Sequence, residues 1–207
     1  MQDLISFIKT IHGRSIEISS HLQQRFSLDS AKEPLGGFAA VGNQSILEFE
    51  LLTHYKNIWS RNHEADQEKL KILRHENGER VMAVTKSAFI LSMSALEFSA
   101  KQVVLTNPAK LRPMKGRVYL SKIIEESVAA GIILMEEERP WKGLIELRNT
   151  AIHNNGIADV TEAYVIPGAH DITFNSGVMV SESWNYFPRL QMWMIEAFGR
   201  WCEGYLR

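Results

Sequence analysis

Apolar residues recur through the first half of the chain at spacings typical of helices. Between residues 4 and 26 they come irregularly, which predicts a helix that is broken or bent near Gly13. Residues 34–38 have loop composition, and a second helix is expected from about Asn43, with a core stripe of Ile46, Phe49, Leu52, Tyr55 and Trp59. The polar residues 60–78 are expected to form a solvated helix or a linker.

The longest predicted helix runs from about Glu79 to Leu105 and is apolar nearly all round, which is typical of a central helix. Residues 119–134 predict another helix, with an interruption at Gly131. A further helix opens at acidic residues 136–138 and Pro140, because a helix N-terminus favours acids and tolerates proline. Gly156 is expected to cap it in a left-handed conformation just beyond His153.

The last part of the chain predicts a small β element and a final helix. Residues 163–166 and 172–174 flank turn residues, and residues 175–177 lead into 178–180, as in a small hairpin. Ser183 or Asn185 then caps a helix that carries Pro188 in its first turn. The expected fold class is all-α, a helical bundle with a small β-hairpin before the C-terminal helix. It forms a single domain over residues 1–207, with residues 1–40 as a candidate N-terminal extension.

Composition narrows the functional classes. The chain has 207 residues, is 45% hydrophobic, and balances 23 Lys+Arg against 24 Asp+Glu, so any nucleic-acid contact must be local. Cys202 is the only cysteine, which excludes an intrachain disulfide and a zinc site built from several thiolates. The N-terminus lacks the pattern of a secretion signal, and no uninterrupted apolar run reaches about 18 residues, so a cytoplasmic protein without membrane contact is expected.

Residues 147–156 are the one segment whose residue types suggest chemistry. Arg148 offers a planar fork of donors suited to phosphate, and His153 can exchange a proton near neutral pH. Asn149 and His153 are four residues apart and therefore share a helix face, and the long stem of Arg148 can bring its guanidinium to the same opening. This set suits cleavage of a phosphodiester.

The segment resembles the Arg-x4–6-His motif of HEPN proteins (higher eukaryotes and prokaryotes nucleotide-binding domain). Four residues separate Arg148 from His153, Asn149 matches the polar residue that follows the family's arginine, and the next residues, Asn154, Asn155 and Gly156, are similar to those of prokaryotic members. An acidic residue on the preceding core helix, here Glu97 within residues 94–98, extends the resemblance. It covers residues 81–159.

The resemblance implies a metal-independent endoribonuclease that needs no cofactor, in a toxin–antitoxin or phage-defence setting. His153 would be the general base or acid, Arg148 would neutralise phosphoryl charge, and Asn149 would orient the phosphate or the imidazole, with Glu97 and Asn154 in support. Attack by the 2′-hydroxyl would give a 2′,3′-cyclic phosphate, so DNA should resist. Members usually form two-fold homodimers with a composite site, and an antitoxin or regulatory protein is an implied partner.

Two other interpretations stay open. In a purely structural one, Arg148 pairs with Glu146 or another acid, while Asn149 and His153 bond the helix end. In the other, a catalytically inactive HEPN-like module binds a partner protein, a nucleotide or RNA.

The spacing of arginine and histidine alone is not specific to the motif, because Arg14 and His21 also satisfy Arg-x6-His. We interpret this second match as accidental.

A cluster of four cations without an acid is the best candidate for contact with the RNA backbone. The cations fall within eight residues of a predicted loop: Lys110, Arg112, Lys115 and Arg117. A solvated loop is the equal alternative. The pairs His63–Glu64 and His75–Glu76 match no tight ligand spacing, so no metal site is expected.

Overall fold

The computed structural model describes residues 1–61, 67–114, 116–153, 156–180 and 186–207. The helices are α1 (Gln2–Phe26), α2 (Leu35–Arg61), α3 (Gln67–Thr106), the short 3₁₀ helix η1 (Pro108–Lys110), α4 (Leu120–Ala129), α5 (Met135–His153) and α6 (Tyr186–Leu206). Two strands, β1 (Glu162–Tyr164) and β2 (Ile172–Phe174), precede α6. The prediction of an all-α bundle with a small β element before the last helix is confirmed.

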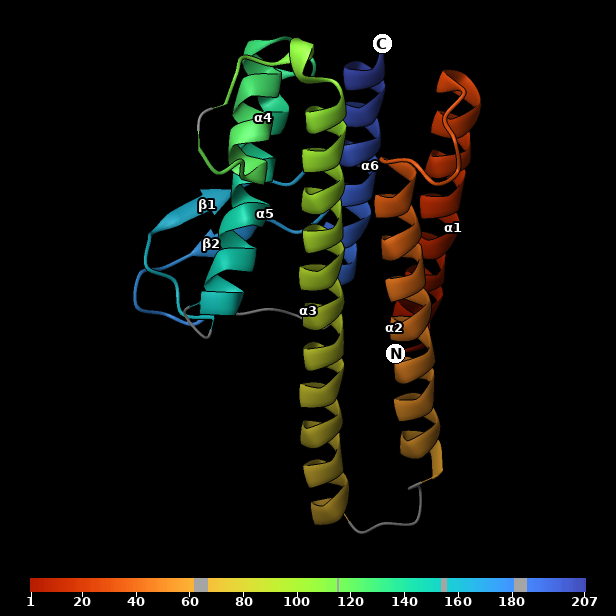
Figure 1. Cartoon of the computed structure of the whole chain (residues 1–207). Helices are drawn as coiled ribbons and strands as arrows, with labels where there is room; N and C mark the ends of the chain where they lie inside the picture. The colour runs from red at the N-terminus through yellow and green to blue at the C-terminus, as the bar shows by residue number, and fades with distance from the viewer. Residues whose placement is uncertain (62–66, 115, 154–155, 181–185) are drawn as a thin grey trace.

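Four long helices form the body of the fold. α1 packs on α2 and α6, and α3 packs on the same two helices, so the four close into a bundle in which α2 runs antiparallel to the others (Figure 1). α4 and α5 form a second layer on the opposite side of α3 from α2 (Figure 1). The small sheet lies against α5. α3 is therefore the central helix, shared by both layers.

The expected break at Gly13 is wrong, because α1 is one continuous helix. Gly13 is exposed, and no atom beyond its own helix lies within 4 Å of the position that a Cβ would take. The buried residues recur at three- and four-residue intervals on the other side of the helix: Leu4, Ile8, Ile11, Ser15, Ile18 and Leu22. Their burial against α2 and α6 outweighs the roughly 1 kcal/mol that an exposed glycine costs a helix.

The expected loop at residues 34–38 is also wrong, because α2 begins at Leu35. Gly37 is used here for close packing, since a Cβ at its position would lie 2.7 Å from the Cβ of Ser99 on α3. The backbone N–H of Gly37 donates to Glu33 Oε2 at 3.1 Å, which satisfies one of the free donors of the helix start. Gly37 therefore lies in the first turn of a helix that touches its neighbour closely.

α3 begins at Gln67, twelve residues before the predicted start, so the polar stretch is helical where the structure describes it. By length and composition the segment Glu68–Thr106 qualifies as a membrane span, and this alone is weak evidence because the core helix of a bundle meets the same criteria. Its side chains at Phe89, Met93 and Leu96 are fully buried within the protein. The predicted interruption at Gly131 is confirmed, since α4 ends at Ala129 and Gly131 has a positive φ of 69°.

The β element is smaller than the sequence pattern suggests. β1 and β2 pair antiparallel in the register Glu162↔Phe174, Ala163↔Thr173 and Tyr164↔Ile172. Residues 178–180 form no strand, and Met179 makes an isolated bridge to Ile157. The candidate helix caps Ser183 and Asn185 lie outside the described residues. Gly143 on α5 lets the sheet approach, because a Cβ there would lie 2.7 Å from the Cβ of Tyr164.

The core joins both ends of the chain. Residues from α1, α2, α3 and α6 belong to one apolar cluster with the side chains of α4, α5 and the sheet. Two buried polar groups stand out in the protein interior. The indole N–H of Trp201 donates to Ser127 Oγ at 2.9 Å, whereas Glu48 on α2 is fully buried and neither of its carboxylate oxygens has a hydrogen-bond partner among the described residues. Burial raises the pKa of Glu48 to about 8.

Candidate functional site

Helix α5 carries the candidate catalytic motif and ends where the sequence predicts. Its core face includes four buried residues spaced three apart: Trp141, Leu144, Leu147 and Thr150. Arg148 and Asn149 are only partly buried, and His153 in the last turn is exposed. Gly156 has a φ of 85°, and its N–H donates to the carbonyl of Thr150 at 3.0 Å, as in a left-handed helix end. The end of α5 therefore presents the histidine to solvent.

An ion pair with α3 holds the arginine. The Arg148 guanidinium donates to Glu97 Oε2 and, through Nη2, to Asn149 Oδ1 at 3.1 Å. The exposed fraction of the side chain is 17% for Arg148 and 10% for Glu97. Glu97 is therefore the acid that pairs with this arginine, and Glu146, which the structural interpretation named, is not.

A second cation shares the same carboxylate. Lys101 Nζ lies 2.6 Å from Glu97 Oε1, one helical turn further along α3. Burial acts to raise the pKa of Glu97, but hydrogen bonds from Lys101 and Arg148 outweigh it, so the pKa lies below its ordinary value. Glu97 is therefore ionised at neutral pH and fixes two cations side by side.

Two adjoining surface depressions meet at Arg148. The first, which we call the glutamate depression, has a volume of about 330 Å³ and is lined by Ser94, Glu97, Phe98, Lys101, Arg117, Tyr119 and Arg148. The second, the histidine depression, has a volume of about 370 Å³ and is lined by Tyr119, Leu120, Ser121, Ile145, Arg148, Asn149 and His153. Both include Tyr119 and Arg148. The structure thus brings Arg148, Asn149, His153 and Glu97 to one continuous stretch of surface.

The predicted backbone-binding cations are only partly placed at this surface. Arg117 lines the glutamate depression, whereas Lys110 and Arg112 are exposed and line neither depression. The remaining cation Lys115 and the supporting residue Asn154 lie outside the described residues.

Sequence reasoning missed Lys101 and Tyr119. Lys101 follows Glu97 by four residues, a spacing that places two side chains on one helix face and was the available signal. Tyr119 is brought to the site by the loop between α3 and α4. Nothing in its local sequence indicates a role there.

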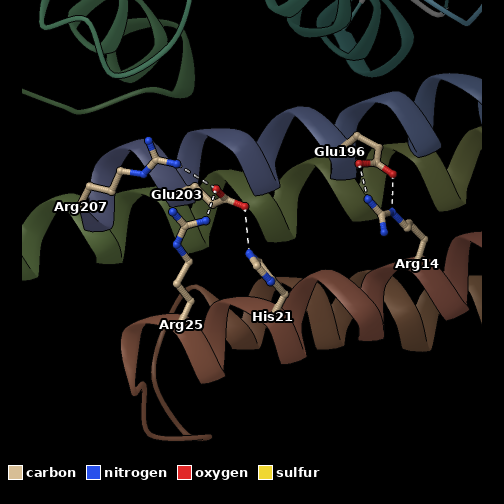
Figure 2. Close-up of polar contacts among 6 residues, drawn as sticks. All are labelled: Arg14, His21, Arg25, Glu196, Glu203 and Arg207. Carbon is tan, nitrogen blue, oxygen red and sulfur yellow. Dashed lines mark hydrogen bonds and ion pairs between the residues drawn. The ribbon is translucent and has the colours of Figure 1, made fainter.

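The rival spacing match, Arg14 and His21, belongs to the packing of α1 on α6 (Figure 2). Arg14 makes a bidentate pair with Glu196, with Nε–Oε1 and Nη2–Oε2 distances of 2.5 and 3.0 Å. His21 Nε2 lies 3.2 Å from Glu203 Oε1, and Glu203 Oε2 also accepts from Arg25 at 2.9 Å. Both side chains of this match are held by carboxylates of one neighbouring helix, which supports its interpretation as an accidental match.

Metal ligands do not gather in the described part of the chain, where no group of three His, Cys, Asp or Glu side chains could hold an ion. His75 is exposed, while His63 and Glu64 lie outside the described residues.

No family model, no curated protein and no solved structure matches the chain. The geometry around Arg148 is therefore the basis for its functional assignment.

Proposed function

We propose that this protein is a metal-independent endoribonuclease of the HEPN type. The observation that carries the proposal is that Arg148, Asn149 and His153 line one open depression at the end of α5. A guanidinium, an amide and an imidazole on one accessible surface supply what transfer of a phosphoryl group to a 2′-hydroxyl requires: charge neutralisation, orientation and proton transfer.

In this reaction the imidazole of His153 removes the proton of a ribose 2′-hydroxyl, and the 2′ oxygen forms a bond to the adjacent phosphorus. The bond from phosphorus to the 5′ oxygen breaks, the 5′ oxygen takes a proton from a second, protonated imidazole, and the products are a 2′,3′-cyclic phosphate and a 5′-hydroxyl. Arg148 neutralises the charge on the non-bridging oxygens, and Asn149 orients its guanidinium.

Glu97 and Lys101 prepare the arginine for this role. The carboxylate fixes the guanidinium, so little side-chain entropy is lost when a phosphate binds. Without a second cation nearby, the Glu97 carboxylate would also cancel the charge of Arg148. Lys101, on the other oxygen of Glu97, leaves this triad with one net positive charge.

A symmetric homodimer would supply the second imidazole, and the outer surface of α3 supports such pairing. Three apolar side chains seven residues apart, each more than half exposed, follow one face of α3, and the middle one also lines the glutamate depression: Leu91, Phe98 and Leu105. We propose that this stripe pairs with a second copy about a two-fold axis. Leu91→Asp should then convert a dimer to a monomer in sedimentation, and an unchanged dimer mass would contradict this interface.

The decisive experiment is cleavage of RNA in excess chelator. Wild type should cut RNA to products ending in 2′,3′-cyclic phosphate and leave DNA intact. His153→Ala and Arg148→Ala should each lower the rate by about 10²–10⁴-fold, because each removes proton transfer or charge stabilisation. His75→Ala, which changes an exposed histidine on α3, is the matched control and should cut like wild type. Circular dichroism must be unchanged in all variants, and cutting that survives both site substitutions would refute the mechanism.

A second candidate function is a catalytically inactive module that binds RNA, a nucleotide or a protein. One observation favours it: the Arg148 guanidinium already has partners in Glu97 and Asn149. A well-folded protein that binds RNA but does not cut it, with Arg148→Ala and His153→Ala weakening binding only modestly, would select this function over the nuclease.

A further inference from the structure

We propose that Arg117, Lys101 and Tyr119 form a second phosphate-binding subsite beside Arg148, so that the ligand is a nucleic-acid strand with at least two consecutive phosphates. This rests on the proposed function in one respect, namely that the ligand of the Arg148 surface is a nucleic acid. The second subsite is where the next phosphate of the strand would bind once one phosphate lies in the histidine depression.

The two depressions adjoin, which gives a path for the strand across the surface. They have Arg148 and Tyr119 in common, and these two side chains form the boundary between them. A phosphate at Arg148 and His153 would leave the neighbouring phosphate of the same strand at the glutamate depression. That depression is open to solvent and has a volume of about 330 Å³.

Tyr119 holds two cations at this place. The centroid of its ring lies 5.4 Å from Arg117 Cζ and 5.8 Å from Lys101 Nζ, both within the range of cation–π attraction. The backbone of Tyr119 is extended and its carbonyl accepts from the N–H of Ile123 at 3.1 Å, so the ring stands at the start of α4. A half-exposed tyrosine thus fixes an exposed arginine from a loop next to a lysine from α3.

The charges favour an anion. Three cations and one carboxylate line the glutamate depression, which leaves two positive charges there. Lys101 and Arg148 are both engaged by Glu97, whereas Arg117 has no carboxylate within 4.0 Å among the residues described in the structure. Arg117 is therefore the cation of this depression without a carboxylate partner, and a guanidinium is well suited to a phosphate.

The test is binding of a DNA 12-mer of thymidine, which has no 2′-hydroxyl to react, measured by fluorescence anisotropy between 50 and 200 mM salt. Arg117→Ala should weaken binding several-fold and lower the slope of log K against log salt by about 0.7, the loss of one phosphate contact to a single strand. The matched control is Arg112→Ala, an exposed cation of the same loop that lines neither depression; it should leave affinity and slope near wild type.

The tyrosine separates a fixed subsite from mere surface charge. Tyr119→Phe keeps the ring and should bind like wild type, while Tyr119→Leu should weaken binding with no change in net charge. Thymidine monophosphate should compete far less well than the 12-mer at equal phosphate concentration. Equal losses in Arg117→Ala and Arg112→Ala, an unchanged Tyr119→Leu variant, or no binding of the 12-mer would overturn the proposal.

The binding assay and the cleavage assay can fail separately. Loss of affinity specific to Arg117, in a protein that cuts no RNA, would keep the subsite and refute the nuclease. Cleavage that depends on His153 but not on Arg117, together with binding indifferent to Arg117, would keep the nuclease and refute the subsite.

Discussion

Glu48 should make the stability of this protein depend on pH in a way that one substitution removes. The side chain is fully buried on α2 and has no hydrogen-bond partner among the described residues. Burial raises its pKa from 4.5 to about 8 because the ionised form has lost its hydration. The folded protein therefore binds this proton more tightly than the unfolded chain does.

The sign and the size follow from linkage. A carboxyl group whose pKa is raised on folding contributes fully to stability below pH 4.5, and this contribution is lost as the pH rises toward 8. At pH 7 the difference is about 2.5 pH units at 1.36 kcal/mol each, or roughly 3 kcal/mol. Glu48→Gln has the same shape and no titration, so we expect it to be about 3 kcal/mol more stable than wild type at pH 7 and nearly equal to it at pH 4.5.

The assay is urea denaturation followed by tryptophan fluorescence at intervals between pH 4.5 and 8. Between pH 5 and pH 7 the free energy of unfolding of wild type should fall by about 1.4 kcal/mol per pH unit relative to Glu48→Gln. Glu50→Gln removes an exposed carboxylate from the same helix and should keep the wild-type dependence. Parallel pH curves for wild type and Glu48→Gln would refute the reasoning.

Two further predictions concern packing. Gly13→Ala should stabilise the protein by about 0.5–1 kcal/mol, because the site is an open helix position. Gly204→Ala should destabilise the protein by about 1–3 kcal/mol, because its Cβ would lie 2.3 Å from the carbonyl oxygen of Ile132. The thermal unfolding midpoints of the two variants must therefore shift in opposite directions from that of wild type. Ser127→Ala removes the acceptor of the buried Trp201 N–H and should cost about 1–3 kcal/mol in urea denaturation, and a loss below 0.5 kcal/mol would show that the indole finds another partner.

Helix type and order could be predicted from the sequence, while several boundaries could not. The end of α5 was predictable because glycine at position 156 permits the left-handed turn that closes a helix. The wrong predictions of a helix break at Gly13 and of a loop at residues 34–38 share one cause. A glycine does not always end a helix: it can be tolerated inside one, or it can lie where two helices touch. Only the neighbour, Ser99 in the case of Gly37, distinguishes these uses.

The candidate site was predictable where its residues lie on helices. Arg148 and His153 are close in sequence, and an acid such as Glu97 on an apolar helix needs a partner, so their association could be inferred. Tyr119 could not be found in this way, because it meets Lys101 and Arg117 through the loop path between α3 and α4. Side chains brought in by a loop carry no periodic signal.

The uneven support of α3 has a consequence for how the molecule opens. Between residues 68 and 80 Asn77 is the one buried side chain, whereas between 88 and 104 more than half of the positions are buried. Amide hydrogens in the first segment should therefore exchange with solvent much faster than those in the second, with protection rising along a single helix. Glu97 lies in the slow-exchanging part, so the surface around Arg148 should keep its shape while the far end of the same helix unwinds and reforms.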